Sequence, residues 1–310
     1  MQIELRDVCG FSSRVGNDVV RLTPGEISAV EGALQEWREL AVPAKPNLAS
    51  QRWGVPSALV RVDMAPLRTL GEHEHFLYEV EGGPGGLGFL SVLGGDEPFR
   101  RIANALVGLG IREIGWEVDP SRVRFEAELS QGVTSLSRSG LSVTRGTNHG
   151  LPLLLRASGE NDFPWERCLC DYSSGGGDKR SLKPFGAVLA DEISDPFAAF
   201  PKGFAIKPRR GTGTKDVHVW VPYQPYKEFS TTQTKAWRIH QVALGAPGRW
   251  VLQPFFPPEY LEEEKALRIW RLFAVWDGKS YRTVGGVWVA RRSLRVHGAS
   301  DSIYGLVTVP

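Results

Sequence analysis

Two short apolar segments, residues 58–63 and 76–81, each end with two charged side chains that are separated by one apolar residue. Alternate residues of a β-strand point to the same face of a sheet, so each segment predicts a strand with one charged face. The polar stretch between the two segments predicts that they pair as a hairpin. One surface of a sheet then holds all four charged residues, which are Arg61, Asp63, Glu79 and Glu81.

Three carboxylates beside one guanidinium suit a hard cation, because Mg²⁺ prefers oxygen ligands. The sequence therefore offers Asp63, Glu79 and Glu81 as candidate metal ligands. The same alternation is also typical of a sheet face that is exposed to water, and spacing alone leaves both interpretations open.

The composition is that of an ordinary folded chain. Among 310 residues, 23% are charged and 42% hydrophobic, and 37 Lys and Arg nearly balance 35 Asp and Glu. This excludes disordered, collagen-like and coiled-coil chains and gives no case for binding to nucleic acid or a membrane. The 35 Gly and 21 Pro favour many turns over a helical bundle. The length predicts about two domains, which we set at residues 1–150 and 151–310.

The three cysteines, Cys9, Cys168 and Cys170, favour a reducing compartment, and we expect a cytoplasmic protein. The last two are too close in sequence for an unstrained disulfide, and no further ligands at zinc spacing accompany them. The N-terminal segment lacks the apolar core of a signal peptide. No apolar run approaches the ~18 residues of a membrane span.

Helical and extended patterns alternate along the chain. A capping box at Thr23 and Glu26 begins a helix. A second helical pattern covers 98–109 and a strand pattern at 113–118 follows it, which predicts an α/β layer. Ser, Gly and Thr are frequent in 130–150, which predicts a loop. Later extended patterns lie at 203–207, 217–221, 250–255, 268–275 and 281–290.

An apolar strand pattern ends at Lys207-Pro208 and runs into a loop that contains Gly211 and Gly213. Such a loop exposes backbone N–H groups to phosphate oxygens, and the basic side chains supply positive charge. It is not a Walker loop, because the lysine precedes the glycines. An ordinary basic hairpin is the alternative.

A third segment, residues 250–256, predicts a strand that ends at Gln253-Pro254 and continues into Phe255 and Phe256. The backbone of such a strand end can bind the edge of a base while apolar side chains pack on its faces. A buried strand end without a ligand explains the same residues.

Together the three motifs resemble the ATP-grasp superfamily, in which a Lys-Pro strand end, a glycine-rich loop and a Leu-Gln-Pro-Phe strand end follow in this order. Here the carboxylates precede the nucleotide lysine. That order resembles the circularly permuted branch that contains glutathionylspermidine synthetase and eukaryotic glutathione synthetase. The resemblance covers residues 58–90 and 179–290. It implies an α+β ATP-grasp fold in which two sheet-containing lobes clasp ATP.

The resemblance also implies roles for the hairpin residues. Glutathionylspermidine synthetase has Arg-x-Asp on one strand and Glu-x-Asn on the next. By that match Asp63, Glu79 and Glu81 bind magnesium, and Arg61 contacts the phosphoryl group in transfer. Glu81 departs from the Asn of the family, which keeps an oxygen ligand and adds one negative charge.

The family has two nucleotide lysines, and the second corresponds to Lys207. For the first we choose Lys183, with Lys179 as its competitor. Gly211 stands where eukaryotic glutathione synthetase has a further metal-binding Glu, so that ligand is absent. The remaining implied nucleotide-binding residues are Gly211, Gly213, Gln253 and Phe255.

A basic run follows the last predicted strand. In the resembled families, arginines from the C-terminal region bind substrate carboxylates, which Arg can hold in bidentate fashion. The candidates for this role are Arg291, Arg292, Arg295 and His297. A solvated basic loop is the alternative, and His297 has no visible partner for a role as general base.

The resemblance implies an ATP- and Mg-dependent carboxylate–amine ligase that forms an amide bond through an acyl phosphate. Its partners are then a small-molecule or peptide carboxylate and an amine. The rival is a non-catalytic relative that binds a nucleotide or another protein, and Gly211 motivates it. A kinase that acts on a hydroxyl or carboxylate would use the same phosphate-binding residues.

Overall fold

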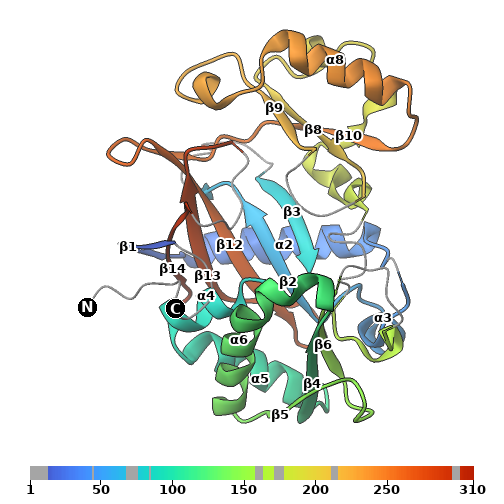
Figure 1. Ribbon diagram of the computed structural model, residues 1–310, viewed down its shortest axis with the longest axis vertical. Coiled ribbons are helices and arrows are strands. Elements are labelled where there is room, and N and C mark those ends of the chain that lie inside the picture. Colours follow the sequence, from blue (N-terminus) through green and yellow to red (C-terminus); the bar gives the residue numbers. More distant parts are fainter. Residues whose placement is uncertain are drawn as a thin grey trace.

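The computed structural model describes residues 13–43, 45–67, 76–83, 85–157, 163–170, 178–210, 216–294 and 301–310. A mixed sheet of seven strands lies at its centre (Figure 1). These strands are β1 (Arg14–Arg21), β2 (Leu59–Met64), β3 (Leu77–Gly82), β11 (Glu259–Leu261), β12 (Ala266–Trp276), β13 (Tyr281–Arg291) and β14 (Ile303–Thr308). Their order is β1-β14-β13-β12-β2-β3, and β11 pairs with β12 outside this path. Early and late parts of the chain therefore meet in one sheet.

The middle of the central sheet is buried on both faces. All residues of β2 and of β12 are buried, which is why both strands are almost continuously apolar. The strands β2 and β3 are antiparallel neighbours, so the predicted pairing of the two charged segments is confirmed.

The helix α2 (Pro24–Leu40) covers one face of the central sheet. It begins with the predicted capping box, in which the Thr23 hydroxyl accepts from the Glu26 N–H and the Glu26 carboxylate accepts from the Thr23 N–H. Trp37 of α2 lies with its ring centroid 6.1 Å from that of Tyr281 in β13. The buried side chains of α2 recur at helical spacing, so its amphipathic pattern determines which face meets the sheet.

An α/β layer covers part of the opposite face. It consists of α4 (Leu87–Gly94), α5 (Glu97–Gly108), α6 (Glu126–Arg138) and a parallel sheet of β4 (Glu113–Val118), β5 (Ser142–Arg145) and β6 (Leu153–Arg156). Phe89 of α4 stacks on Tyr304 of β14 at 4.2 Å between ring centroids. The predicted helix and strand at 98–109 and 113–118 are confirmed within this layer.

The predicted loop over 130–150 is wrong for much of that range, because α6 continues to Arg138 and β5 follows it. Leu129, Val133 and Leu136 recur at helical spacing and are buried. The Ser, Gly and Thr residues between them weaken the helical signal in the sequence. Packing against α4 supplies the stability that local propensity does not.

Gly88 of α4 lies where α4 crosses α6, and a Cβ at this position would stand 2.3 Å from the carbonyl oxygen of Glu128. We expect Gly88→Ala to lower the free energy of unfolding by about 1–3 kcal/mol, because the two helices must move apart. Gly108→Ala is the matched control, since a Cβ there meets nothing within 4 Å. Denaturant titration should find the control within about 1 kcal/mol of the wild type. An equal loss in both variants would contradict the steric explanation.

A third, antiparallel sheet lies at the far end of the molecule from the α/β layer and is covered by the helix α8 (Gln233–Leu244) (Figure 1). The strands of this small sheet are β7 (Val188–Leu189), β8 (Phe204–Pro208), β9 (His218–Trp220) and β10 (Trp250–Pro254), and the short helix α7 (Pro196–Ala199) packs beside them. Its order is β7-β10-β8-β9, so the Lys-Pro strand and the Gln-Pro strand are neighbours. The predicted α+β class, with separate sheets, is confirmed.

Short segments connect these layers, namely α3 (Leu48–Trp53) and the 3₁₀ helices η2 (Pro120–Phe125), η3 (Trp165–Arg167), η4 (Lys179–Phe185), η5 (Ala190–Glu192) and η6 (Tyr226–Phe229). Cys168 and Cys170 are buried and unbridged. Within the described ranges, no helix is long and apolar enough to cross a membrane.

Candidate active site at the junction of two sheets

Strand register assembles the charged face of β2 and β3. Arg61 pairs with Glu81 across the two strands, and Asp63 pairs with Glu79. Directly opposite residues of an antiparallel pair share a face, so all four lie on one surface. Arg61 joins two of the carboxylates: its Nε is 2.9 Å from Asp63 Oδ1, and its Nη2 is 2.7 Å from Glu81 Oε2.

Three of these four side chains are buried and Glu79 is partly buried, so the interpretation as a water-exposed sheet face does not apply. Arg61, Asp63 and Glu81 are 8%, 6% and 9% exposed. Burial raises the pKa of the Glu81 carboxyl, and the neighbouring Arg61 guanidinium opposes that rise. Buried ions are tolerated only in pairs, because an unpaired one keeps its full desolvation cost.

Arg271 of β12 belongs to the same surface, and the sequence analysis missed it. It lies opposite Asp63 in the register between β12 and β2, and its Nη2 is 3.1 Å from Asp63 Oδ2. Asp63 is therefore shared by two guanidinium groups, because Arg61 donates to both of its oxygens and Arg271 donates to Oδ2. The available signal was a basic residue inside an otherwise apolar strand, but nothing in the sequence indicates that β12 lies beside β2.

A β-bulge at Tyr78 connects the central sheet to the small sheet. Asp63 is opposite Glu79 while Met64 is opposite Leu77, so Tyr78 is the extra residue. The carbonyl of Tyr78 accepts a hydrogen bond from Lys207 Nζ at 2.8 Å. β3 is an edge strand, and its outward backbone groups pair here with side chains of the small sheet.

Gln253 of β10 completes this connection. Its Nε2 donates to the carbonyl of Leu77 at 2.6 Å, and its Oε1 accepts from Lys207 Nζ at 2.7 Å. Tyr78 contributes a further contact, since its hydroxyl donates to the carbonyl of Phe256 at 2.7 Å. The strands that carry Lys207 and Gln253 are thus held directly against the edge of the charged face.

Burial governs the electrostatics of Lys207, which is 6% exposed. Burial and, to a smaller extent, the positive charge of Lys179 lower the pKa of the ammonium, which is about 8. The negative charges of Glu79 and Asp63 oppose the shift. The amine is therefore costly to charge, and it lies against the backbone of Tyr78, the residue before Glu79.

Lys179 and Lys183, the two candidates for the first nucleotide lysine, have different surroundings. Lys179 is buried with its Nζ 3.5 Å from Glu79 Oε1. Lys183 is exposed and lines a surface pocket with Arg210. Both belong to η4, and a 3₁₀ helix has three residues per turn, so side chains four positions apart point in different directions. Lys179 is the one that faces the carboxylates.

Two buried side chains hold the beginning of α4 and the residues just before it. Arg61 Nη1 donates to the carbonyl of Gly85 at 3.2 Å. Glu128 of α6 accepts from the Gly88 N–H at 2.7 Å and pairs with Arg156 Nη1 at 2.5 Å. Burial raises the pKa of the Glu128 carboxyl, and Arg156 opposes the rise. Glu128 therefore stabilises the beginning of α4 as a buried cap.

The other candidates lie elsewhere or outside the described ranges. Phe255 contacts Tyr226 at 5.3 Å between ring centroids. Arg291 Nε is 2.9 Å from Asp301 Oδ1, and Arg292 Nε donates to the carbonyl of Glu264 at 3.1 Å. The candidates that fall outside the described residues are Gly211, Gly213, Arg295 and His297.

The three predicted metal ligands are on one face, but they are not gathered around a common point. Among the residues that the structure describes, no three Asp, Glu, His or Cys side chains are grouped closely enough to hold a metal ion. Arg61 explains this, because its guanidinium pairs with both Asp63 and Glu81. The donor chemistry fits Mg²⁺, since all three ligands are carboxylates. Metal binding would require Arg61 to release at least one of them.

No family model and no curated protein matches the chain. Among solved structures, the chain is similar to a protein of Methylobacillus flagellatus KT that is described provisionally as a gamma-glutamylcysteine synthetase. The superposition covers 87% of this chain and 81% of that chain, with a TM-score of 0.41 and 13% sequence identity. A likeness at this distance does not define a family for the chain.

Proposed function

We propose that the protein is an ATP-dependent carboxylate–amine ligase of the ATP-grasp type. One observation carries the proposal: two buried lysines meet the same part of β3, since Lys179 of η4 pairs with Glu79 and Lys207 of β8 donates to the carbonyl of the preceding residue, Tyr78. These residues come from segments that are far apart in the chain. Burying two amines at one place opposes folding, because each charge loses its hydration. A role in binding the negative charges of phosphate would account for two buried amines at one place.

The place where the edge strand β3 of the central sheet meets β8 and β10 of the small sheet is called the junction here, and its side chains suit phosphoryl transfer. Lys179 and Lys207 would bind phosphate oxygens of ATP, and Arg61 would hold the terminal phosphoryl group as charge spreads over its oxygens. Magnesium would supply further neutralisation of that charge when bound. Its candidate ligands are Asp63, Glu79 and Glu81.

The proposed reaction has two steps. In the first, the bond between the terminal phosphorus and its bridging oxygen breaks, the phosphoryl group joins an oxygen of the substrate carboxylate, and ADP leaves. In the second, an amine nitrogen attacks the acyl carbon, phosphate leaves, and the nitrogen loses a proton. Exclusion of water from the junction would protect the acyl phosphate from hydrolysis.

Candidates for the remaining contacts follow from the resemblance. Gln253 and Phe255 are proposed for the base, and Phe255 lines an apolar pocket of about 310 Å³ together with Tyr223. The glycines proposed for the phosphates are Gly211 and Gly213. The residues proposed for the acid substrate are Arg291, Arg292, Arg295 and His297.

A second candidate function is a nucleotide-binding protein without ligase activity. The pairing of Arg61 with both Asp63 and Glu81 favours it. The guanidinium neutralises these carboxylates without a metal ion, whereas the proposed ligase would need them to bind Mg²⁺. A kinase that stops after the first step is a third candidate and would use the same lysines.

Release of ADP tests the proposed function. The purified protein is incubated with ATP, Mg²⁺ and a mixture of amino acids, small peptides and polyamines, and ADP and new amides are measured. A ligase releases ADP in proportion to amide and only when an acid and an amine are both present. A kinase needs only the acceptor. ATP binding without ADP release in any mixture would overturn the proposal and support the second candidate.

The affinity for ATP should depend on pH through Lys207, whose pKa is about 8. Only the charged amine attracts phosphate, and bound phosphate raises its pKa. We therefore expect a constant affinity well below this pKa and a fall of up to about tenfold per pH unit above it. Calorimetric titration across this range checks the profile. A wild-type profile as flat as that of Lys207→Met would contradict the role of this amine.

Lys179 and Lys183 form a matched pair for mutation, since both belong to η4. Lys179→Met should weaken ATP binding by about tenfold or more, because it removes a charged donor beside the phosphates. Lys183→Met should change the affinity by less than about twofold, as expected for an exposed side chain away from the junction. Equal effects in calorimetric titration would show that η4 is oriented differently toward the nucleotide.

A further inference from the structure

A second pocket lies beside η4, and the proposed function does not account for it. It has a volume of about 380 Å³, within the range of small-molecule sites. Its lining residues are Leu40, Val42, Pro43, Asp178, Arg180, Ser181, Lys183 and Arg210. They come from the end of α2, the beginning of η4 and the segment after β8.

Positive charge dominates one wall of this η4 pocket. Asp178 is the one acidic residue among the described lining residues, and it pairs with three arginines, of which Arg180 and Arg210 also line the pocket. Arg180 Nη2 is 2.7 Å from its Oδ2, Arg209 Nε is 2.8 Å from its Oδ1, and Arg210 Nη2 is 3.9 Å from its Oδ2. Hydrogen bonds from Arg209 and Arg180 hold the pKa of Asp178 well below its usual range despite its burial. Asp178 thereby orients the arginines.

Lys183 adds a further cation and makes no ion pair with any residue that the structure describes. The described lining of the pocket therefore has two arginines and one lysine against one carboxylate, which leaves an excess of two positive charges. Guanidinium groups favour planar or tetrahedral anions that accept several hydrogen bonds. This excess suits a doubly charged acid group better than a singly charged one.

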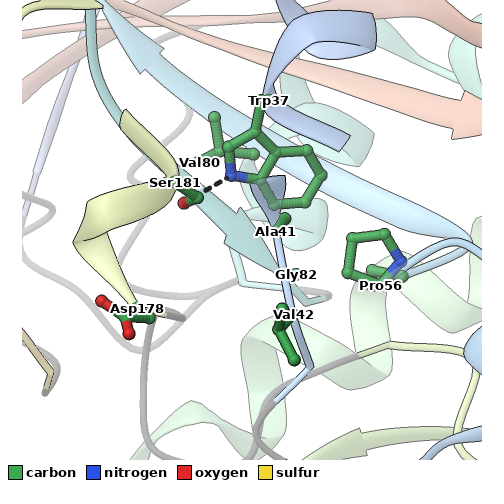
Figure 2. Close-up of a pocket in the computed structure, with 9 residues that line it drawn as sticks. Trp37, Ala41, Val42, Pro56, Val80, Gly82, Asp178 and Ser181 are labelled. Atoms are coloured by element: carbon green, nitrogen blue, oxygen red, sulfur yellow. Dashed lines mark hydrogen bonds between the residues drawn. The ribbon is translucent and has the colours of Figure 1, made fainter. Parts of the chain in front are cut away.

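The other wall is apolar. Leu40 and Val42 are 48% and 73% exposed, and both belong to the small set of large exposed hydrophobic residues in the described part of the chain. Val42 also lines a narrow inner pocket with Asp178 and Ser181, which Figure 2 shows. There the Trp37 indole N–H donates to Ser181 Oγ at 3.1 Å. The inner pocket has room for about one water molecule, so a ligand would stay in the outer one.

The η4 pocket is separate from the charged junction. Val80 and Gly82 line the narrow inner pocket beside it, and in β3 they alternate with Glu79 and Glu81, which belong to the opposite face of the sheet. Lys179 points to Glu79 while Lys183 lines the pocket. A ligand in the pocket would therefore not compete with a nucleotide at the junction.

We propose that the η4 pocket binds a small amphipathic acid, in which a doubly negative group such as a phosphate monoester is joined to a short apolar group. The acid group contacts Arg180, Lys183 and Arg210, and the apolar group packs on Leu40 and Val42. This site does not depend on the proposed ligase activity.

Octyl phosphate, kept below its micelle concentration, is the probe for calorimetric titration of the full chain. We expect saturable binding of one molecule. Octanoate, which has a single charge, and inorganic phosphate, which lacks the apolar group, should each bind at least about tenfold more weakly. Binding should be unaffected by saturating ATP.

Two variants test the two walls. Lys183→Gln combined with Arg210→Gln, and separately Val42→Asn, should each weaken octyl phosphate binding by at least about tenfold. All three side chains are exposed, so thermal unfolding should be unchanged. Lys227→Gln, an exposed lysine elsewhere, should bind like the wild type. The proposal is overturned by absent binding, by equal binding of inorganic phosphate, by displacement with ATP, or by unchanged affinity in the variants.

Discussion

Replacing Lys207 with methionine should remove most ATP binding while the protein remains folded. The ammonium donates to the Tyr78 carbonyl and to Gln253 Oε1 and faces the carboxylates of the junction. Methionine keeps the length and the apolar packing of lysine but has no donor. A hydrogen bond to a charged group contributes about 1.5–3 kcal/mol. We therefore expect a loss of about 10- to 100-fold in ATP affinity, measured by calorimetric titration.

The stability of this variant shows whether the loss is specific. Burial of the charged amine opposes folding, as the lowered pKa of Lys207 indicates, whereas its two hydrogen bonds favour folding. These effects act in opposite directions, so the unfolding temperature should change little. Lys235→Met, at an exposed lysine of α8, is the matched control and should bind ATP like the wild type. If the Lys207→Met protein is folded and binds ATP with wild-type affinity, the proposed nucleotide site at Lys207 is wrong.

Replacing Arg61 with lysine should leave ATP binding nearly unchanged and lower turnover by about 100-fold or more. A guanidinium can hold two oxygens of a phosphoryl group at once, and an ammonium cannot reproduce that geometry. Interactions made chiefly in the transition state lower the rate when they are lost and alter substrate binding little. Arg61→Ala should lose more, because Asp63 and Glu81 then lose a shared partner as well. Steady-state kinetics of ADP release measure both variants.

Two other results for the Arg61 variants would contradict a role in the transition state. A fall in ATP affinity at constant turnover would make Arg61 a ground-state contact to phosphate. No change in either parameter would show that the charged face of β2 and β3 is not the site of the reaction. Arg100→Lys is the control, because Arg100 forms an exposed ion pair with Glu97 on α5 and should not affect either parameter.

Some of the fold could be predicted because local rules suffice for it. The capping box at Thr23 and Glu26 begins α2, since it satisfies backbone donors within a single turn. The helix α6 could not be predicted in the same way. Its Ser, Gly and Thr residues indicate a loop locally, and the buried contacts of Leu129, Val133 and Leu136 that stabilise the helix come from the packed layer.

The sequence by itself determined the charged face of the site. Alternation along a pleated strand makes Arg61 share a face with Asp63, and Glu79 with Glu81, whatever surrounds them. Only the tertiary structure decided which partners meet that face. Lys179 rather than Lys183 faces Glu79, Arg271 joins through the neighbouring strand, and the bulge at Tyr78 presents a carbonyl to Lys207. Such contacts depend on strand order and on the orientation of a short helix, which arise from packing between distant segments and leave no periodic trace in the chain.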